Sequence, residues 1–395
     1  MGAQFKFIHC ADLHLGSRFR GVARDDRGRA AEMTASVFAS FSRIVDVAID
    51  ERADAMVISG DAFDEETITP RTRDFLCREL ARAGIPVFMV RGNHDPVTQW
   101  ESEIPFPPNV HVFGTEPEAI DIPGVESAEV IGASFMDWHD SRNLPSMMRG
   151  SPDRFTVACV HCDVDNPSSE YEYSPCSRSD FFGKGVDYWA LGHIHKRAVL
   201  CEDPWVVYPG NIQGRSFKET GEKGAYLVTV RDGRVDGLRF IPTQAIVWHD
   251  IRQDITGLDM NSLKEALATR VGKGSVVRLT FIGAGQLDRM VRDRPDDVMS
   301  ILESYLGCTI SSMSVETTES IDPELRRGER DMIGVSADVG FSIRDASVKD
   351  IIDIICSNPI LRKNRPFFES MPEEDLRAIV TDATRSIVNM RGASR

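Results

Sequence analysis

The chain has 395 residues, a formal net charge of −15 at pH 7, and 42% hydrophobic and 27% charged residues. This length favours two or three domains, and the composition excludes a largely disordered or collagen-like protein. No segment approaches the roughly 18–20 uncharged apolar residues of a membrane helix, and an acidic chain needs a local basic patch or bound metal to contact nucleic acid.

The N-terminus predicts a strand rather than a signal peptide. The apolar residues 5–11 run directly into Asp12, with no basic lead and no cleavage site. We therefore expect a cytoplasmic protein with no membrane partner. Eight cysteines are too few for a disulfide scaffold. Cys159 and Cys162 lack the second pair that a zinc site needs, so we interpret them as structural residues of a strand.

Five short apolar runs in the first 245 residues each end in a cluster of Gly, Asp, Asn or His. Runs of this length, bounded by turn residues, are typical of buried central strands. The runs span residues 5–11, 55–59, 87–90, 155–160 and 188–191.

Helical patterns separate the early strands. Apolar residues at helical spacing predict one helix over residues 31–51. Thr69 and Pro70 predict the start of a second helix, and Gly84 stands where its C-terminal cap belongs. The alternation of strand and helix predicts a layered α/β sheet, in which ligands gather beyond the carboxyl ends of the strands.

After about Trp248 this pattern stops, and the sequence predicts a smaller α+β unit followed by a helical tail. The expected elements are helices at 262–271, 298–306, 348–356 and 373–390, a strand at 275–282, and a charged loop at 322–331. We accordingly divide the chain into domains at residues 1–248, 249–345 and 346–395.

The polar residues at the strand ends form a mixed set of carboxylate, imidazole and amide ligands. They are Asp12, His14, Asp61, Asn93, His94, His161, His193 and His195. Such a nitrogen and oxygen set suits Mn²⁺, Fe²⁺ or Zn²⁺. Seven of them, without His94, suffice for two metals if one carboxylate bridges the ions, an arrangement that promotes phosphoryl displacement.

Residue spacing supports this interpretation. Asp12 and His14 are two residues apart at a strand end, as are His193 and His195, so each pair projects to one side. Asp95 follows His94 and could orient or charge its imidazole. Each motif alone could be an ordinary turn or surface loop, but their joint occurrence after apolar strands favours a metal centre.

The order of these motifs resembles the signature of the calcineurin-like metallophosphoesterase superfamily. The segment 208–217, with the sequence YPGNIQGRSF, further resembles the SbcD-type branch of DNA repair exonucleases, including the YhaO-like proteins. The resemblance covers about residues 4–245. It implies a layered β-sandwich core flanked by helices, with a smaller C-terminal α+β capping domain and a helical tail.

The resemblance also implies roles for the site residues. One metal would be held by Asp12, His14, Asp61 and His195, and the other by Asp61, Asn93, His161 and His193. His94 would protonate the leaving oxygen or stabilise the transition state, with Asp95 behind it. Two divalent ions, typically Mn²⁺, would activate water to attack a phosphodiester. The chain departs from the pattern at Asp64, where eukaryotic and archaeal relatives carry a second active-site histidine that helps to position the phosphate.

Basic residues near the motifs suggest contacts with DNA. Arg18, Arg20 and Arg24 follow the first motif, with Phe19 between them, while Lys196 and Arg215 follow the last motifs. A basic, aromatic-containing loop could track a nucleic-acid backbone. The same arginines could equally form a solvated loop that leads into the first helix.

Three hypotheses follow. The first is a DNA exonuclease that could also cut internally and acts in DNA repair as a homodimer. Its capping domain would grip the duplex, and its tail would dock onto an SMC-like coiled-coil ATPase of SbcC or YhaN type. The second is a metal-dependent phosphodiesterase or phosphatase acting on nucleotides or small phosphoesters. The third is a non-catalytic scaffold on the same fold. The apolar stripe of the tail helices could equally be buried against the chain's own surface.

Overall fold

The computed structural model describes residues 4–17, 27–64, 68–99, 104–166, 173–319 and 322–392. By their internal contacts, these residues divide into two compact units, Met1–Trp248 and His249–Arg395. None of the described helices is both long enough and apolar enough to cross a membrane. All eight cysteines are free, and both Cys159 and Cys162 are buried.

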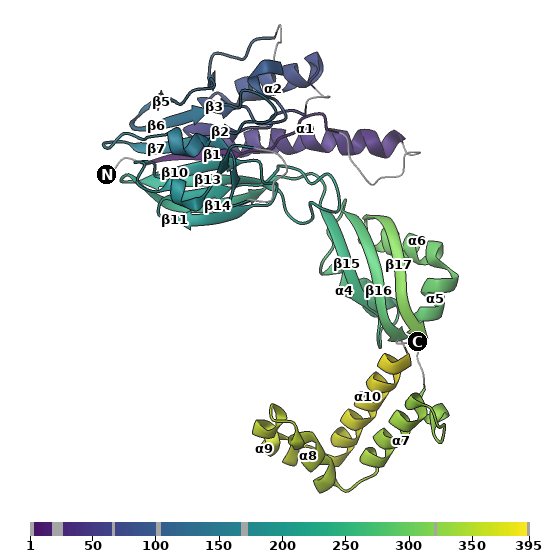
Figure 1. Cartoon of the computed structure of the whole chain (residues 1–395). Coiled ribbons are helices and arrows are strands. Elements are labelled where there is room, and N and C mark those ends of the chain that lie inside the picture. Colours follow the sequence, from purple (N-terminus) through teal and green to yellow (C-terminus); the bar gives the residue numbers. More distant parts are fainter. Residues whose placement is uncertain are drawn as a thin grey trace. The chain divides into compact units, whose positions relative to one another are not determined.

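The first unit is a sandwich of two six-stranded sheets (Figure 1). In spatial order, one sheet consists of β14 (Arg234–Pro242), β13 (Gly224–Arg231), β1 (Gln4–Cys10), β2 (Ala55–Ser59), β3 (Val87–Val90) and β4 (Val110–Val112). The other consists of β11 (Ala198–Glu202), β12 (Trp205–Tyr208), β10 (Tyr188–Gly192), β7 (Phe155–His161), β6 (Val125–Ala133) and β5 (Glu118–Ile122). A small additional sheet pairs β8 (Asp163–Val164) with β9 (Pro175–Cys176). These elements confirm the expected layered α/β class.

Buried side chains from both sheets form the core between them. Phe7 and Val57 from one sheet pack in the same cluster as Val157 and Tyr188 from the other. Within the first sheet, β1, β2 and β3 pair in parallel, and β7 and β10 do so in the second. The parallel pairing brings the carboxyl ends of these strands to common edges, which is where their polar residues lie.

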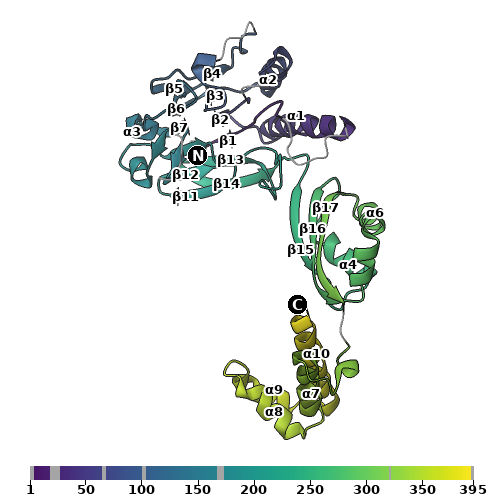
Figure 2. The same cartoon turned by 45° about the vertical axis from the view of Figure 1, so that its right-hand side comes forward.

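Helices cover the first sheet on its outer face (Figures 1 and 2). Phe41 of α1 (Arg27–Asp50) and Leu76 of α2 (Pro70–Ala83) pack in one cluster with residues of β1 and β2. The Thr69 side chain accepts a hydrogen bond from the backbone N–H of Thr72, and Gly84 ends α2 with a φ of 66°. Both predicted ends of α2 are confirmed. The short α3 (Leu144–Met147) and the 3₁₀ helix Arg178–Phe181 contribute to the core beside the second sheet.

The second unit contains a three-stranded sheet, whose strands in order are β15 (Trp248–Asp254), β16 (Val276–Gly285) and β17 (Thr309–Glu319). Its helices are α4 (Met260–Ala268), α5 (Asp288–Asp293) and α6 (Pro295–Leu306). Leu263, Phe281 and Leu302 belong to their common core. The elements α4, β16 and α6 confirm predicted ones. The strands β15 and β17 were not predicted, because exposed Asp and Arg residues in β15 and exposed Ser and Glu residues in β17 obscure the apolar pattern.

Four helices complete the described part of the second unit: α7 (Met332–Arg344), α8 (Val348–Ser357), α9 (Arg365–Glu369) and α10 (Glu373–Gly392). The predicted tail helices correspond to α8 and α10. Residues 322–331, expected as a charged loop, include the 3₁₀ helix Pro323–Arg326. Ile333, Ala337 and Phe341 of α7 cluster with Val388 of α10. We call residues 332–392 the helical part of the second unit. It begins at Met332, within the segment that the sequence assigns to the capping domain.

Candidate active site

The carboxyl ends of five strands supply the candidate ligands. Asp12 follows β1, Asp61 follows β2 and Asn93 follows β3, while His161 ends β7 and His193 follows β10. The two sheets of the sandwich therefore bring together side chains that lie far apart in the sequence.

One group of ligand atoms gathers around His14. Its Nε2 atom lies 3.0 Å from Nε2 of His195 and 3.8 Å from Oδ2 of Asp61. The nearby carboxylate of Asp12 accepts the backbone N–H of His193 at 3.0 Å, which ties the β1 loop of the first sheet to the β10 loop of the second.

A second group gathers around Asn93. Its Oδ1 atom lies 3.0 Å from Nε2 of His161 and 3.2 Å from Nδ1 of His193. Oδ2 of Asp61 is 3.5 Å from Nε2 of His161. Asp61 consequently contacts both groups, which is the position a bridging carboxylate requires.

The donor atoms are spaced as metal ligands are. One atom each of Asp12, His14 and His195 lies within 4.8 Å of the others, and the same holds for Asp12, Asp61 and His161. A third such group joins His14 to Asp64 and His94. Imidazole, carboxylate and amide donors of this kind fit divalent first-row metals.

The backbone is strained at four of these residues. Asp12, His14, Asp61 and His193 have φ values of 51°, 45°, 52° and 101°. Non-glycine residues rarely adopt such positive φ angles, and in structures they concentrate at functional sites. Here the unusual backbone turns side chains at the strand ends toward a common point.

Three histidines have their outer nitrogens occupied. Nδ1 of His14 donates to Asp64, that of His195 donates to Glu219 at 2.7 Å, and that of His161 donates to the backbone oxygen of Ser59 at 2.9 Å. These partners select the tautomer in which Nε2 keeps its lone pair. The inward-facing nitrogens are therefore prepared to bind a cation.

Protonation also favours metal binding. Although burial opposes ionisation, electrostatic interactions with His161, His94 and His14 lower the pKa of Asp61. Burial, reinforced by the electrostatic interaction with His161, lowers the pKa of His193 to about 3. At neutral pH the carboxylate is charged and the imidazole neutral, which are the forms that coordinate metals.

Gly92 is required by the close approach of the β3 loop to Asp61. A Cβ atom added at Gly92 would lie 2.2 Å from Oδ1 of Asp61 and 2.8 Å from Cε1 of His161. Only glycine leaves room for the carboxylate in its present position.

The structure corrects the expected pairing of Asp95 with His94. Asp95 is buried, and among the described residues its hydrogen-bond donors are the backbone N–H groups of Ala62, Phe63 and Gly92. These bonds tie the β2 loop to the β3 loop. The carboxylate that approaches His94 is that of Asp64, whose Oδ1 lies 3.6 Å from Nδ1. Adjacency in sequence misled the prediction, because Asp95 turns inward while the side chain of His94 is 44% exposed.

The predicted DNA contacts fall into three classes. Arg18, Arg20 and Arg24 lie outside the described residues. Lys196 is exposed. The guanidinium of Arg215 lies 3.3 Å from Asp64 and 3.5 Å from Glu219, so it is occupied by two carboxylates beside the candidate ligands.

Sequence reasoning missed Glu219 and the hydrogen bond between Asp64 and His14. Glu219 belongs to no motif, and its contact with His195 spans 24 positions. The one local signal is its i,i+4 spacing from Arg215, which is too common to identify a site.

The chain resembles known phosphoesterases. A family model described as calcineurin-like phosphoesterase matches residues 5–197. The chain is 36% identical over 258 residues to the uncharacterized metallophosphoesterase YhaO of Bacillus subtilis, an alignment that covers 63% of each chain. It is 30% identical over 287 residues to the SbcD subunit of the SbcCD nuclease of the same organism, covering 62% of this chain and 69% of that one.

The chain also resembles a DNA repair protein. The chain is 27% identical over 246 residues to the DNA double-strand break repair protein Mre11 of Aeropyrum pernix, covering 56% of this chain and 57% of that protein. The alignments with YhaO and this Mre11 thus span less than two thirds of the relatives' own lengths.

Proposed function

Because this chain belongs to the calcineurin-like phosphoesterase family, whose members bind divalent metals, we propose that it is a two-metal DNA phosphodiester hydrolase of the SbcD type. In this proposal it acts in DNA repair as an exonuclease that could also cut internally. The observation that carries the proposal is the convergence of seven ligand-type side chains on one edge of the sandwich. DNA as the substrate draws its support from the names of the Mre11 and SbcCD relatives.

The proposed ligands divide between two positions that share Asp61. One comprises Asp12, His14, Asp61 and His195, and the other comprises Asp61, Asn93, His161 and His193. Manganese is the proposed metal, since the mixed nitrogen and oxygen set suits it. When bound, a pair of such ions activates water and stabilises the charge that develops on a phosphate.

His94 is the proposed general acid. Its side chain is half-exposed, and its ring centroid lies 5.1 Å from that of His14. Oδ1 of Asp64 lies 3.6 Å from Nδ1 of His94 and would orient the ring toward the leaving oxygen. A positioned general acid typically contributes about 10²–10⁴-fold to a rate.

The test is hydrolysis of linear duplex, hairpin and single-stranded DNA in the presence of Mn²⁺. His94→Gln should lower kcat by about 10²–10⁴-fold, while elemental analysis still finds close to two metal ions per chain. His111→Gln, at a partly exposed histidine of β4 paired with Glu118, is the matched control and should retain full activity.

Other outcomes would redirect the assignment. Hydrolysis of bis-para-nitrophenyl phosphate without degradation of any DNA would favour a phosphodiesterase for small substrates. Absence of both activities in a metal-loaded protein would favour the non-catalytic scaffold.

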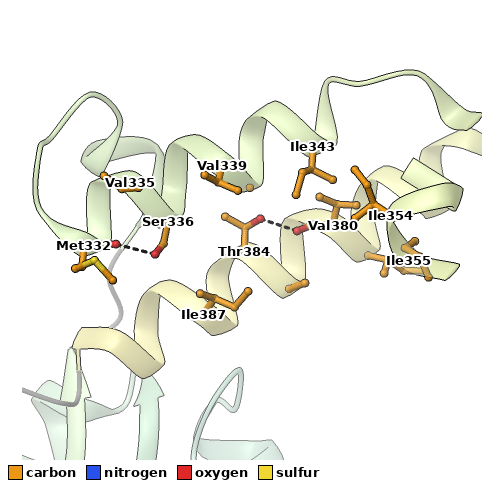
Figure 3. A pocket seen from close by; sticks show the side chains of 13 residues that line it. Met332, Val335, Ser336, Val339, Ile343, Ile354, Ile355, Val380, Thr384 and Ile387 are labelled. Carbon is orange, nitrogen blue, oxygen red and sulfur yellow. Dashed lines mark hydrogen bonds between the residues drawn. The ribbon is translucent and has the colours of Figure 1, made fainter. Parts of the chain in front are cut away.

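We also propose that the helical part binds an SMC-like coiled-coil ATPase of SbcC or YhaN type. A groove of about 460 Å³ lies between α7, α8 and α10. Figure 3 shows apolar side chains of α7 facing those of α10 across it. Val335 and Val339 are about half exposed, and an exposed apolar groove is typical of helix-binding surfaces. Lysine introduced at Val335 should prevent co-purification with such an ATPase, and undiminished binding would contradict the proposal.

Two further proposals rest on the resemblance alone. Residues 249–345 would contact duplex DNA, and the chain would form a homodimer. Light scattering of the purified protein tests the dimer, and a monomer at micromolar concentration would contradict it. DNA affinity after charge reversal of exposed Arg289, compared with exposed Arg385, tests the duplex contact.

A further inference from the structure

Residues 209–223, here called the strap, connect β12 to β13 and pack against His195. The strap lies entirely outside residues 5–197, the part of the chain that matches the family model. Nζ of Lys223 donates to the backbone oxygen of His195 at 2.7 Å, and the backbone N–H of Asn211 donates to the same oxygen at 3.4 Å. Glu219 accepts from the ring at Nδ1. The strap therefore holds both the backbone and the imidazole of His195.

The approach of the strap to His195 depends on Gly210. This residue has a φ of 77°, and an added Cβ would lie 2.9 Å from both the backbone oxygen of His195 and the backbone nitrogen of Arg197. A side chain would push the strap away from the ring that it contacts.

Glu219 itself is held in place. Its Oε2 atom accepts the backbone N–H of Arg215 at 2.7 Å, while Oε1 accepts from His195. The side chain is only 14% exposed. The guanidinium of Arg215 also lies 3.3 Å from Asp64, the acceptor for His14. Arg215 thus joins the two carboxylates that orient His14 and His195.

The strap is anchored to the rest of the first unit. The buried side chain of Gln213 accepts the backbone N–H groups of Ala245 and Ile246 and donates to the backbone oxygen of Ile246 at 2.7 Å. The indole of Trp248 donates to the backbone oxygen of Gly214 at 2.7 Å. With its ends and middle fixed, the strap can set the direction of Glu219.

The two proposed metal positions differ in the groups that orient their histidines. His14 and His195 are oriented by side-chain carboxylates. His161, in the other position, is oriented by the backbone oxygen of Ser59, and Nε2 of His193 lies 4.0 Å from the nearest Asp163 oxygen. The metal position that contains His14 and His195 therefore depends on side chains that can each be removed by one substitution.

We propose that Glu219 is a positioning residue for His195, through which the strap controls the affinity of the metal position formed by Asp12, His14, Asp61 and His195. This inference rests on the proposed two-metal function. A carboxylate behind a histidine fixes the ring tautomer and makes the inner nitrogen a stronger ligand. Loss of such a partner typically lowers metal affinity by about 10–100-fold.

The experiment is a calorimetric titration of the full chain with Mn²⁺ alone. Glu219→Ala should bind one of two ions about 10–100-fold more weakly and the other with unchanged affinity. At one equivalent of Mn²⁺, electron paramagnetic resonance should show an isolated ion in this variant. Glu219→Gln keeps an acceptor for Nδ1 and should restore part of the affinity. Glu222→Ala is the matched control, since Glu222 lies on the same strap, is exposed and pairs with Arg197.

Two results would overturn the inference. Two ions bound by Glu219→Ala at wild-type affinity would show that Glu219 does not position His195. Equal weakening of both ions, together with a lower Tm, would show a general structural role, and Glu219→Gln would then weaken both ions as well. Wild-type protein that binds fewer than two ions would overturn the proposed metal centre itself, and this outcome is distinguishable because it is seen without any substitution.

Discussion

The two units differ in what they bury and what they expose. The first unit buries Asp12, Asp61, Asp95 and His161 beside its strand ends. In the described part of the second unit, Asp288 is the one buried ionisable side chain apart from Cys356, whereas many large apolar side chains are exposed, including those of the groove. Burying charge is costly unless it is compensated, and the first unit buries several charged groups together at the candidate site. Large exposed apolar patches are instead typical of surfaces that bind another molecule.

The largest effect is expected on the stability of the second unit, with no effect on the chemistry of the first. Phe281 is fully buried in the core of the second unit. Phe281→Ala should lower the free energy of unfolding of this unit by about 3–5 kcal/mol, because it leaves a cavity. Urea unfolding checks this, with Phe367→Ala at an exposed position of α9 as control. If the folded variant lost phosphodiester hydrolysis, the chemistry of the first unit would depend on the core of the second.

A smaller effect is expected on catalysis by the first unit, with no effect on the stability of the second. Gly92→Ala should displace Asp61 and lower kcat for a phosphodiester by about 100-fold, since misplacement of about 1 Å costs that much. The unfolding of the second unit should not change. Gly114→Ala, in the same unit with no atom within 4 Å of the added Cβ, should retain activity. Equal losses in both variants would contradict this account.

The contribution of a charged pair to stability should also be larger in the first unit than in the second. Although burial opposes it, hydrogen bonds from Arg142 lower the pKa of Asp140 in the first unit. Because the folded pKa is below the unfolded value of 3.8, the stabilisation is present above about pH 4 and is lost as the pH falls further. Asp140→Asn should cost about 1.5 kcal/mol at pH 7, and the difference should shrink in acid.

The matched change in the second unit is Asp250→Asn. Asp250 pairs with Arg278, and both side chains are about 40% exposed, so the pair is screened by solvent. Chemical denaturation at pH 7 and pH 3.5 compares the two variants. A larger loss for Asp250→Asn would reverse the comparison.

The smallest expected effect on stability concerns the groove. Val339 of α7 is 53% exposed, so Val339→Lys should change the free energy of unfolding by no more than about 0.5 kcal/mol. Hydrolysis of a small phosphodiester should also be unchanged. Ser386→Lys, on the exposed side of α10, is the control. Strong destabilisation by Val339→Lys alone would show that the groove belongs to the core of this unit.

The sequence predicts the strand ends of the first unit well, because each buried strand carries a local signal. The limits of β2 and β3 agree with the predicted runs 55–59 and 87–90. The second unit is harder to predict, since β15 and β17 mix polar and apolar residues. Local patterns also failed for α7, whose apolar residues lie both in its contact with α10 and on its exposed side.

Within the candidate site, chain neighbours and spatial neighbours differ. Asp95 follows His94 in sequence, yet Asp64 approaches its ring. Glu219 reaches His195 because the strap folds back over it. Such contacts depend on loop geometry, which motif spacing does not encode. The candidate ligands were found because each lies at or shortly after the end of a strand, whereas the residues that orient them have no such marker.

The positive φ angles at Asp12, His14, Asp61 and His193 have an evolutionary consequence. Glycine adopts such angles without steric cost, so exchanging any of the four for glycine would relieve the backbone while removing a donor atom. Laboratory selection for heat resistance alone would therefore favour glycine at these four positions. Selection for turnover would instead retain the four ligand residues. The trade-off between rigidity and catalysis is thus concentrated in a few peptide units.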